Sequence, residues 1–254
     1  MTEWDASGYA QISKLQQAMA AEVLDRLELR GNERILDVGC GNGRVTSEIA
    51  ARTSSGTVVG VDASEEMIAF AAGHYRRDNL RFEVADARHL PFHAQFDLVV
   101  SWNALHWIPE QHQALRAIGT ALKPAGAAQL RLVPKGPRKS LEESIEETRH
   151  EPRWARYFAD FRDPYLRLTP EQYARTAAES GFEVKSLRTE DVAWDFKSRA
   201  GFEAFASVTF VEWNKRLPGY EKPEFTRDVL DRYRSVSAGN LFRFYQMDIT
   251  LAAR

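Results

Sequence analysis

Residues 35–43, which read Ile-Leu-Asp-Val-Gly-Cys-Gly-Asn-Gly, constrain the fold more than any other stretch of the chain. The apolar residues are typical of a buried strand that ends near an acid, Asp37, and the alternate glycines are typical of a turn that opens a helix near Arg44. A second apolar run, 57–61, ends in another acid, Asp62. Such a strand–turn–helix unit lets the backbone approach a nucleotide, and the second acid can hold ribose hydroxyls.

The spacing of the glycines indicates which nucleotide is bound. A dinucleotide fingerprint needs a third glycine where Arg44 stands. Asp37 precedes the glycines, and a carboxylate there would repel a pyrophosphate but attract an ammonium or a sulfonium. The pattern therefore disfavours a nicotinamide dehydrogenase and favours S-adenosylmethionine.

Composition restricts the class of protein. The 254 residues suffice for one large α/β domain with an insertion, and 44% hydrophobic and 28% charged residues are ordinary for a globular protein. A net charge of −2 gives no basic footprint for nucleic acid, and no apolar run approaches a membrane span. The polar N-terminus is unlike a signal peptide, and the single cysteine excludes an internal disulfide. We expect a cytoplasmic protein without nucleic-acid or membrane partners and without a metal site.

Helix and strand patterns alternate through the first half of the chain. Helices are expected at 9–29, 44–52, 64–75 and 109–122. Strands are expected at 35–38, 57–61, 80–85, 96–102 and 126–133. This alternation is typical of a mainly parallel sheet with right-handed crossovers.

The regular pattern stops after Val133. A helix from Thr169 to Gly181 and strands at 182–187 and 245–252 complete the elements that we expect. About 50 residues separate the last two strands, which is too long for an ordinary connection and favours a lid or cap.

The glycine and acid motifs resemble those of class I S-adenosylmethionine-dependent methyltransferases. The resemblance implies a seven-stranded, mainly parallel Rossmann-like sheet in the order 3-2-1-4-5-7-6, with helices on both faces and a helical cap. It implies a single methyltransferase domain over 1–254. Its parts would be an N-terminal helical segment (1–30), a cofactor-binding core (31–133) and cap insertions (134–168 and 190–240).

The same resemblance assigns roles to three acids that follow predicted strands. Asp37 would lie close to the methionine end of the cofactor, and Asp62 would accept hydrogen bonds from the ribose hydroxyls. Asp86 would accept the exocyclic amine of adenine.

Apolar and backbone groups complete the expected cofactor site. Ala63 and Met67 would give adenine an apolar face, and the Ala87 amide would donate to a ring nitrogen. The full cofactor set is Tyr9, Asp37, Gly39, Gly41, Gly43, Asp62, Ala63, Met67, Asp86, Ala87 and Asn103.

The stretch 101–107 follows the fourth strand, beside the sulfonium, and should begin the acceptor pocket. It lacks the D/N-P-P-Y/F motif of nucleic-acid amino-methyltransferases, and its Ala-Leu-His-Trp is similar to the A-L-x-W of small-molecule carboxyl O-methyltransferases. Those include the trans-aconitate, juvenile-hormone-acid and malonyl-carrier-protein enzymes. The resemblance implies that Gln16 and Trp107 donate to an acceptor carboxylate and that Tyr9 closes over the methyl donor. His106 is a candidate general base.

Alternatives remain open. The enzyme could esterify a carboxylate, which needs no base, or methylate N, O or C of a neutral metabolite with His106 as the base. A non-catalytic cofactor-binding protein is a third interpretation. Trp107, His106 and Gln16 also fit ordinary packed or solvated positions, and neither the acceptor nor the oligomeric state can be deduced.

Overall fold

The computed structural model describes residue 15 and residues 18–254. Two predicted site residues, Tyr9 and Gln16, lie outside the described residues. The chain divides into two compact units. We call one the sheet unit (22–134, 166–190 and 246–254) and the other the helical unit (135–165, 191–245 and the described part of 1–21).

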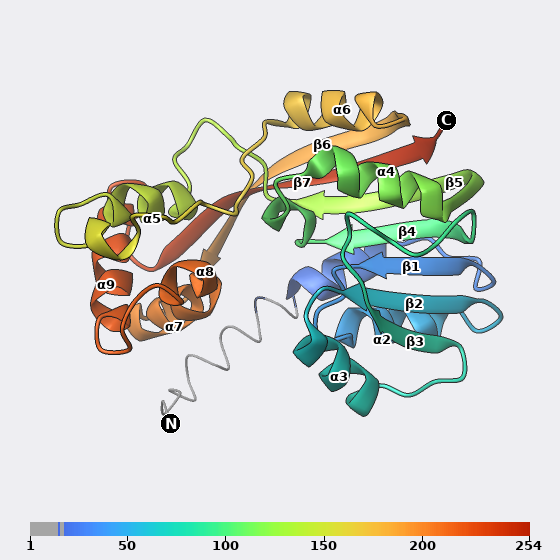
Figure 1. The fold of residues 1–254 in the computed structure, drawn as a ribbon, viewed down its shortest axis with the longest axis horizontal. Coiled ribbons are helices and arrows are strands. Elements are labelled where there is room, and N and C mark those ends of the chain that lie inside the picture. The colour runs from blue at the N-terminus through green and yellow to red at the C-terminus, as the bar shows by residue number, and fades with distance from the viewer. Residues whose placement is uncertain (1–14, 16–17) are drawn as a thin grey trace. The chain divides into compact units, whose positions relative to one another are not determined.

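A seven-stranded sheet in the order β3-β2-β1-β4-β5-β7-β6 organises the fold (Figure 1). Its strands are β1 (Arg34–Val38), β2 (Thr57–Asp62), β3 (Leu80–Val84), β4 (Phe96–Trp102), β5 (Leu122–Leu132), β6 (Phe182–Asp195) and β7 (Leu241–Ala253). β1 pairs in parallel with β2 and β4, β2 with β3, and β4 with β5, whereas β7 runs antiparallel to β5. The predicted strand order is confirmed.

Helices connect the strands within the sheet unit and are the main regular elements of the helical unit. The sheet unit contains α2 (Arg44–Arg52), α3 (Glu65–His74), the 3-10 helix η1 (Leu105–Trp107), α4 (Gln111–Ala121) and α6 (Pro170–Glu179). A further helix at 18–26 begins outside this unit and ends within it. The helical unit contains α5 (Leu141–Arg149), the 3-10 helix η2 (Ala155–Tyr157), α7 (Arg199–Thr209), α8 (Val211–Asn214) and α9 (Lys222–Tyr233).

Alternate strand residues of the sheet unit belong to two different apolar clusters. Leu36 and Val38 of β1 pack in a cluster that includes residues of α4 and α6. Ile35, which directly precedes Leu36 and points to the opposite face, packs in a second cluster with residues of α2 and of the helix at 18–26. Because side chains alternate across a strand, helices cover both faces of this sheet, as predicted.

Local capping explains where several helices begin. Ser64 precedes α3 and its hydroxyl accepts from the Met67 amide, and reciprocal capping boxes open α5 at Ser140 and α6 at Thr169. These starts agree with the sequence-based boundaries at Ser64 and Thr169.

Several predicted boundaries are wrong by two or more residues, and β7 begins at Leu241 rather than at 245. α4 begins at Gln111 rather than at Pro109, because the intervening chain follows the η1 turn. β5 begins at Leu122, and its register against β4 shifts between Phe96 and Leu98. β6 continues to Asp195 rather than ending near 187. Most of this extension is at least partly exposed, so the alternation that marks a half-buried strand is weak there.

Aromatic side chains form the interior of the helical unit. Trp154, Phe158 and Phe225 are buried, with ring centroids 5.2 Å apart for Trp154–Phe225 and 5.4 Å for Phe158–Phe225. The Trp154 indole N–H donates to Asp228, and that of Trp213 donates to Glu146, both at 2.9 Å. Buried indoles with satisfied N–H groups are typical of a stable core.

Candidate active site

A cavity of about 500 Å³ lies in the sheet unit beyond the carboxyl ends of β1, β2, β3 and β4. Ligands of open α/β sheets bind at this edge. Its lining residues are Gly39, Asp62, Ala63, Ala85, Asp86, Ala87, Arg88, Asn103, Ala104, Trp107, Ile108, Pro109 and Glu110. The structure thus brings together six residues of the predicted cofactor set and Trp107 of the predicted acceptor set.

The glycine turn after β1 depends on two close approaches of the backbone. Gly39, Gly41 and Gly43 all have positive φ, at 77°, 53° and 77°. A Cβ on Gly39 would lie 2.2 Å from the Ala104 Cβ, and one on Gly43 would lie 2.6 Å from the Ala71 Cβ. Gly39 therefore lets the turn meet the loop after β4 at the cavity, whereas Gly41 and Gly43 shape the turn without lining the cavity.

Asp62 is fixed at the cavity by two backbone donors. Its carboxylate accepts from the amides of Gly41 and Ser64, each at 2.9 Å. The Asp62 carbonyl accepts from the Ala85 amide at 3.0 Å, which joins the ends of β2 and β3. Because a carboxylate has about four acceptor sites, Asp62 keeps capacity for ligand hydroxyls.

Asp86 is held by its neighbour Arg88. The Arg88 guanidinium donates to both carboxylate oxygens, and the Arg88 amide donates to Oδ1 at 2.9 Å. The side-chain hydrogen bond from Arg88 lowers the pKa of Asp86. Arg88 also pairs with Glu110 at 3.1 Å, so one cation joins two acids of the cavity lining.

Asn103 follows β4 in a left-handed conformation, with φ at 57°. The backbone N–H of Asn103 donates to the Arg131 carbonyl at 2.9 Å. Among the described residues, none provides a hydrogen-bond partner for the buried Asn103 Oδ1. A buried acceptor in this position is suited to a donor group on a ligand.

Asp37 and Met67, two predicted cofactor residues, are absent from the cavity lining that the structure describes. The Asp37 side chain is buried and accepts from the Thr46 hydroxyl at 2.7 Å. Burial, and then repulsion from Asp62, raise the pKa of Asp37 to about 7 against the opposing effect of the Thr46 hydrogen bond. The Met67 side chain is 46% exposed. Their predicted contacts with the cofactor stay predictions.

His106 and Trp107 are adjacent in η1 but line different cavities. Trp107 lines the large cavity, whereas His106 lines a separate one of about 10 Å³ together with Gln111 and Tyr173. His106 is buried, and burial lowers its pKa to about 3. The Val133 amide donates to its Nδ1 at 3.4 Å. A general base at neutral pH needs a pKa nearer the working pH and access to the acceptor.

Gln111, which the sequence did not single out, fixes the η1 turn. Its side chain is buried, and Nε2 donates to the carbonyls of Leu105 and Ile108 at 2.5 and 2.6 Å. These two carbonyls flank the segment that carries Trp107. One amide therefore holds the turn that presents Trp107 to the cavity.

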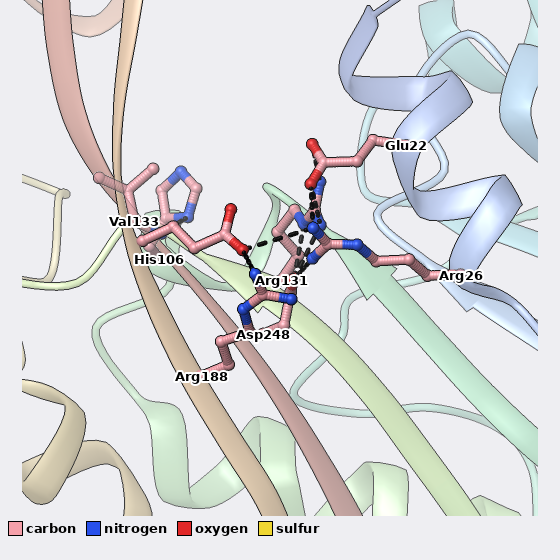
Figure 2. Close-up of polar contacts among 8 residues, drawn as sticks. Glu22, Arg26, His106, Arg131, Val133, Arg188 and Asp248 are labelled. Carbon is pink, nitrogen blue, oxygen red and sulfur yellow. Dashed lines mark hydrogen bonds and ion pairs between the residues drawn. The ribbon is translucent and has the colours of Figure 1, made fainter.

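An ion-pair cluster surrounds the buried Arg131 side chain (Figure 2). The Arg131 side chain is 1% exposed and forms a fork with Asp248 at 2.6 and 2.8 Å. It also contacts Glu22 at 3.2 Å, and Arg26 pairs with Asp248 at 2.7 Å. The cluster ties the helix at 18–26 to β5 and β7.

Sequence analysis gave no site role to five residues that line the cavity: Ala85, Arg88, Ile108, Pro109 and Glu110. Arg88 directly follows the Asp86-Ala87 motif, and Glu110 follows Pro109 at a predicted helix start. The opposite charges of Arg88 and Glu110 could have indicated an ion pair, but nothing in their spacing predicts that both residues line one cavity.

Comparison with known proteins identifies relatives of this chain. A family model described as a methyltransferase domain matches residues 35–126. A trans-aconitate 2-methyltransferase of Rhodococcus jostii is 31% identical, covering 73% of this chain and 72% of that protein. That of Deinococcus radiodurans is 34% identical, but over only 48% of this chain and 46% of its own length.

Solved structures share the fold. The geranyl diphosphate C-methyltransferase of Streptomyces coelicolor, crystallised with S-adenosyl-L-homocysteine, is 16% identical with a TM-score of 0.60. The alignment covers 100% of this chain and 86% of that one. At this identity the likeness concerns the fold.

Two kinds of feature are absent from the described residues. Within residues 18–254, no helix is both long and apolar enough to cross a membrane. In the same part of the chain, no group of three or more His, Cys, Asp or Glu residues could hold a metal ion.

Proposed function

Because the chain belongs to the class I S-adenosylmethionine-dependent methyltransferases, we propose that it methylates a carboxylate of a small molecule to give a methyl ester. The similarity to trans-aconitate 2-methyltransferases makes an unsaturated polycarboxylic acid the first candidate acceptor. The proposal places the enzyme in the cytoplasm, acting on a free metabolite rather than on nucleic acid or a membrane.

The lining of the large cavity suits the cofactor. Asp62 retains acceptor capacity for ribose hydroxyls, and Asp86 with Ala87 would receive the adenine base. Asn103 Oδ1 is a buried acceptor that the ammonium group of the methionine portion would satisfy. Gly39 lets the glycine turn pack against Ala104 at the cavity, an approach that a Cβ at this position would prevent.

The observation that carries the carboxylate proposal is the position of His106. It is buried, its pKa is lowered to about 3, and it lines a different cavity from Trp107. Methylation of a hydroxyl or carbon acceptor needs a group that removes a proton, and His106 is unsuited to that role. A carboxylate acceptor is already ionised at neutral pH and needs none.

The proposed reaction is an in-line displacement. A carboxylate oxygen of the acceptor attacks the methyl carbon, a carbon–oxygen bond forms, and the carbon–sulfur bond breaks. The electron pair of that bond goes to sulfur, which changes from sulfonium to neutral thioether, and no proton moves. The protein contributes by positioning the two reactants and excluding water. Trp107 would donate its indole N–H to the acceptor carboxylate.

The test is transfer of label from methyl-tritiated S-adenosylmethionine to a panel of carboxylic acids that includes trans-aconitate. Base treatment of the product releases volatile labelled methanol only from an ester. Base-stable label would indicate N-, C- or ether methylation and refute the carboxylate proposal. Cofactor binding without transfer to any acid or to a metabolite extract would favour a non-catalytic protein.

A pair of tryptophan variants tests the acceptor site. Trp107→Phe should raise the acceptor KM about tenfold, the effect of losing one hydrogen bond to a charged group, and leave affinity for S-adenosylhomocysteine unchanged. Trp102→Phe is the matched control, because Trp102 ends β4 but does not line the large cavity. Equal KM values for the two variants would contradict the role of Trp107.

A further inference from the structure

Arg88 occupies an unusual position at the proposed cofactor site. It lines the large cavity together with both of its acidic partners, Asp86 and Glu110. Asp86 follows β3 and Glu110 directly precedes α4, so Arg88 connects two separate loops of the sheet unit. These three side chains are each between one-third and one-half exposed, as expected at the mouth of a cavity.

The contacts of Arg88 leave Asp86 little freedom. Nε contacts Oδ1 and Oδ2 at 3.0 Å each, Nη2 donates to Oδ2 at 2.6 Å, and the Arg88 amide donates to Oδ1 at 2.9 Å. An ionised carboxylate offers about four acceptor sites, and the three donors of Arg88 occupy most of them. The fork and the backbone bond together fix the rotamer of Asp86 and the direction of its remaining acceptor site.

We infer that Arg88 is a positioning residue that aims Asp86 at the exocyclic amine of the adenine ring, and so determines how selectively the site binds an adenosyl cofactor. This inference rests on the proposed function, which places adenine beside Asp86 and Ala87. Glu110 supports the arrangement by holding the free end of the guanidinium at 3.1 Å.

The role predicts an effect that depends on the amine. Without Arg88, the Asp86 side chain can rotate. Its hydrogen bond to the amine must then offset the entropy lost when the ligand fixes that side chain. A cofactor analogue that carries a carbonyl in place of the amine makes no such bond, so its affinity should not depend on Arg88. A general loss of cavity structure would weaken both ligands alike.

The experiment measures dissociation constants of S-adenosylhomocysteine and S-inosylhomocysteine by calorimetry. For Arg88→Ala, we expect S-adenosylhomocysteine to bind about five- to tenfold more weakly, the effect of one hydrogen bond, and S-inosylhomocysteine to bind within twofold of wild type. Arg88→Lys should lie between, because lysine is a point charge that cannot form the fork. Glu110→Gln should give a smaller loss of the same kind.

Arg81→Ala is the matched control. Arg81 also pairs with an acid two residues away, Glu83 on the same strand, but neither residue lines the cavity. It should leave both constants unchanged. An Arg88→Ala variant that weakens both ligands equally, or neither, would overturn the inference while leaving the proposed function intact. Failure of the wild-type protein to bind S-adenosylhomocysteine would instead refute the proposed function.

Discussion

Replacing Asp248 by asparagine should destabilise the sheet unit far more than the loss of an ordinary surface charge. The Arg131 guanidinium is buried and has its shortest contacts, 2.6 and 2.8 Å, with Asp248 (Figure 2). Asparagine keeps the size of the side chain but removes the negative charge. The asparagine Oδ1 can still accept one hydrogen bond, but the ion pairs left to Arg131 would be the longer contacts with Glu22, at 3.2 and 3.4 Å.

The size of the effect follows from the burial of Arg131. Removing one partner of a buried ion pair costs about 3–5 kcal/mol, because it leaves a charge uncompensated. Glu22 still contacts Arg131, and the Asp248 side chain is 31% exposed, so the lower end, about 3 kcal/mol, applies. With a urea m-value of about 3 kcal/mol/M, the unfolding midpoint should fall by about 1 M.

The assay is urea unfolding followed by circular dichroism, at low and high salt. Glu183→Gln is the control, because Glu183 and Lys185 pair at 2.7 Å on β6 but are 57% and 50% exposed. An exposed pair contributes about 0–1 kcal/mol, so the control midpoint should move by no more than about 0.3 M. Most of the Asp248 effect should persist at high salt, since the Arg131 charge that it compensates is buried and poorly screened. A shift equal to that of the control would refute this account of the Arg131 cluster.

Three further outcomes are expected. Gly39→Ala should reduce affinity for S-adenosylhomocysteine more than tenfold in calorimetry, because the added Cβ would meet the loop after β4 at 2.2 Å and φ is +77°. Gln111→Leu should lower the free energy of unfolding by about 2–3 kcal/mol by removing both donors to η1, whereas Tyr173→Phe, whose hydroxyl has no protein partner among the described residues, should be nearly neutral in the same urea titration. Burial lowers the pKa of His106 to about 3, so its contribution to stability is complete above pH 6.5 and is lost as the pH falls. The pKa of Asp37 is raised to about 7, so the free energy of unfolding that Asp37 contributes falls as the pH rises from 3.8 to 7. In Asp37→Asn only the His106 effect remains, so the free energy of unfolding should rise by about 1.4 kcal/mol per pH unit between pH 4 and 6.5. A free energy of unfolding that does not change with pH in that variant would contradict the lowered pKa of His106.

The parts of the fold that could be predicted are those fixed by local pattern. Continuous apolar runs and the glycine turn located β1, β2 and β4, because a strand buried on both faces and a tight turn each restrict residue type strongly. The full extent of β6 could not be predicted in this way. Its C-terminal part continues past 187 to Asp195 and is largely polar, so its pairing depends on the neighbouring strand rather than on its own composition.

Side-chain direction limited the prediction of the site. His106 and Trp107 are adjacent in sequence and both were expected at the acceptor, but the η1 turn directs them to different cavities. Asp86 was recognised from its motif, while its fork with Arg88 was not, since both residue types commonly occur as solvated charges. Predictions for Tyr9 and Gln16 concern residues outside those that the structure describes.

The insertion of β7 between β5 and β6 has a consequence for biosynthesis. β5 and β6 are both synthesised before β7, yet they are neighbours of β7 and not of each other. At ~5–20 residues per second, a ribosome needs several seconds to make the chain from the end of β6 to the end of β7. During that interval the edge of β5 has no partner strand, and unpaired edges invite intermolecular pairing. Until β7 has been synthesised, the nascent chain should therefore depend on chaperones, and a stop codon before Leu241 should give an aggregating product rather than a smaller folded domain.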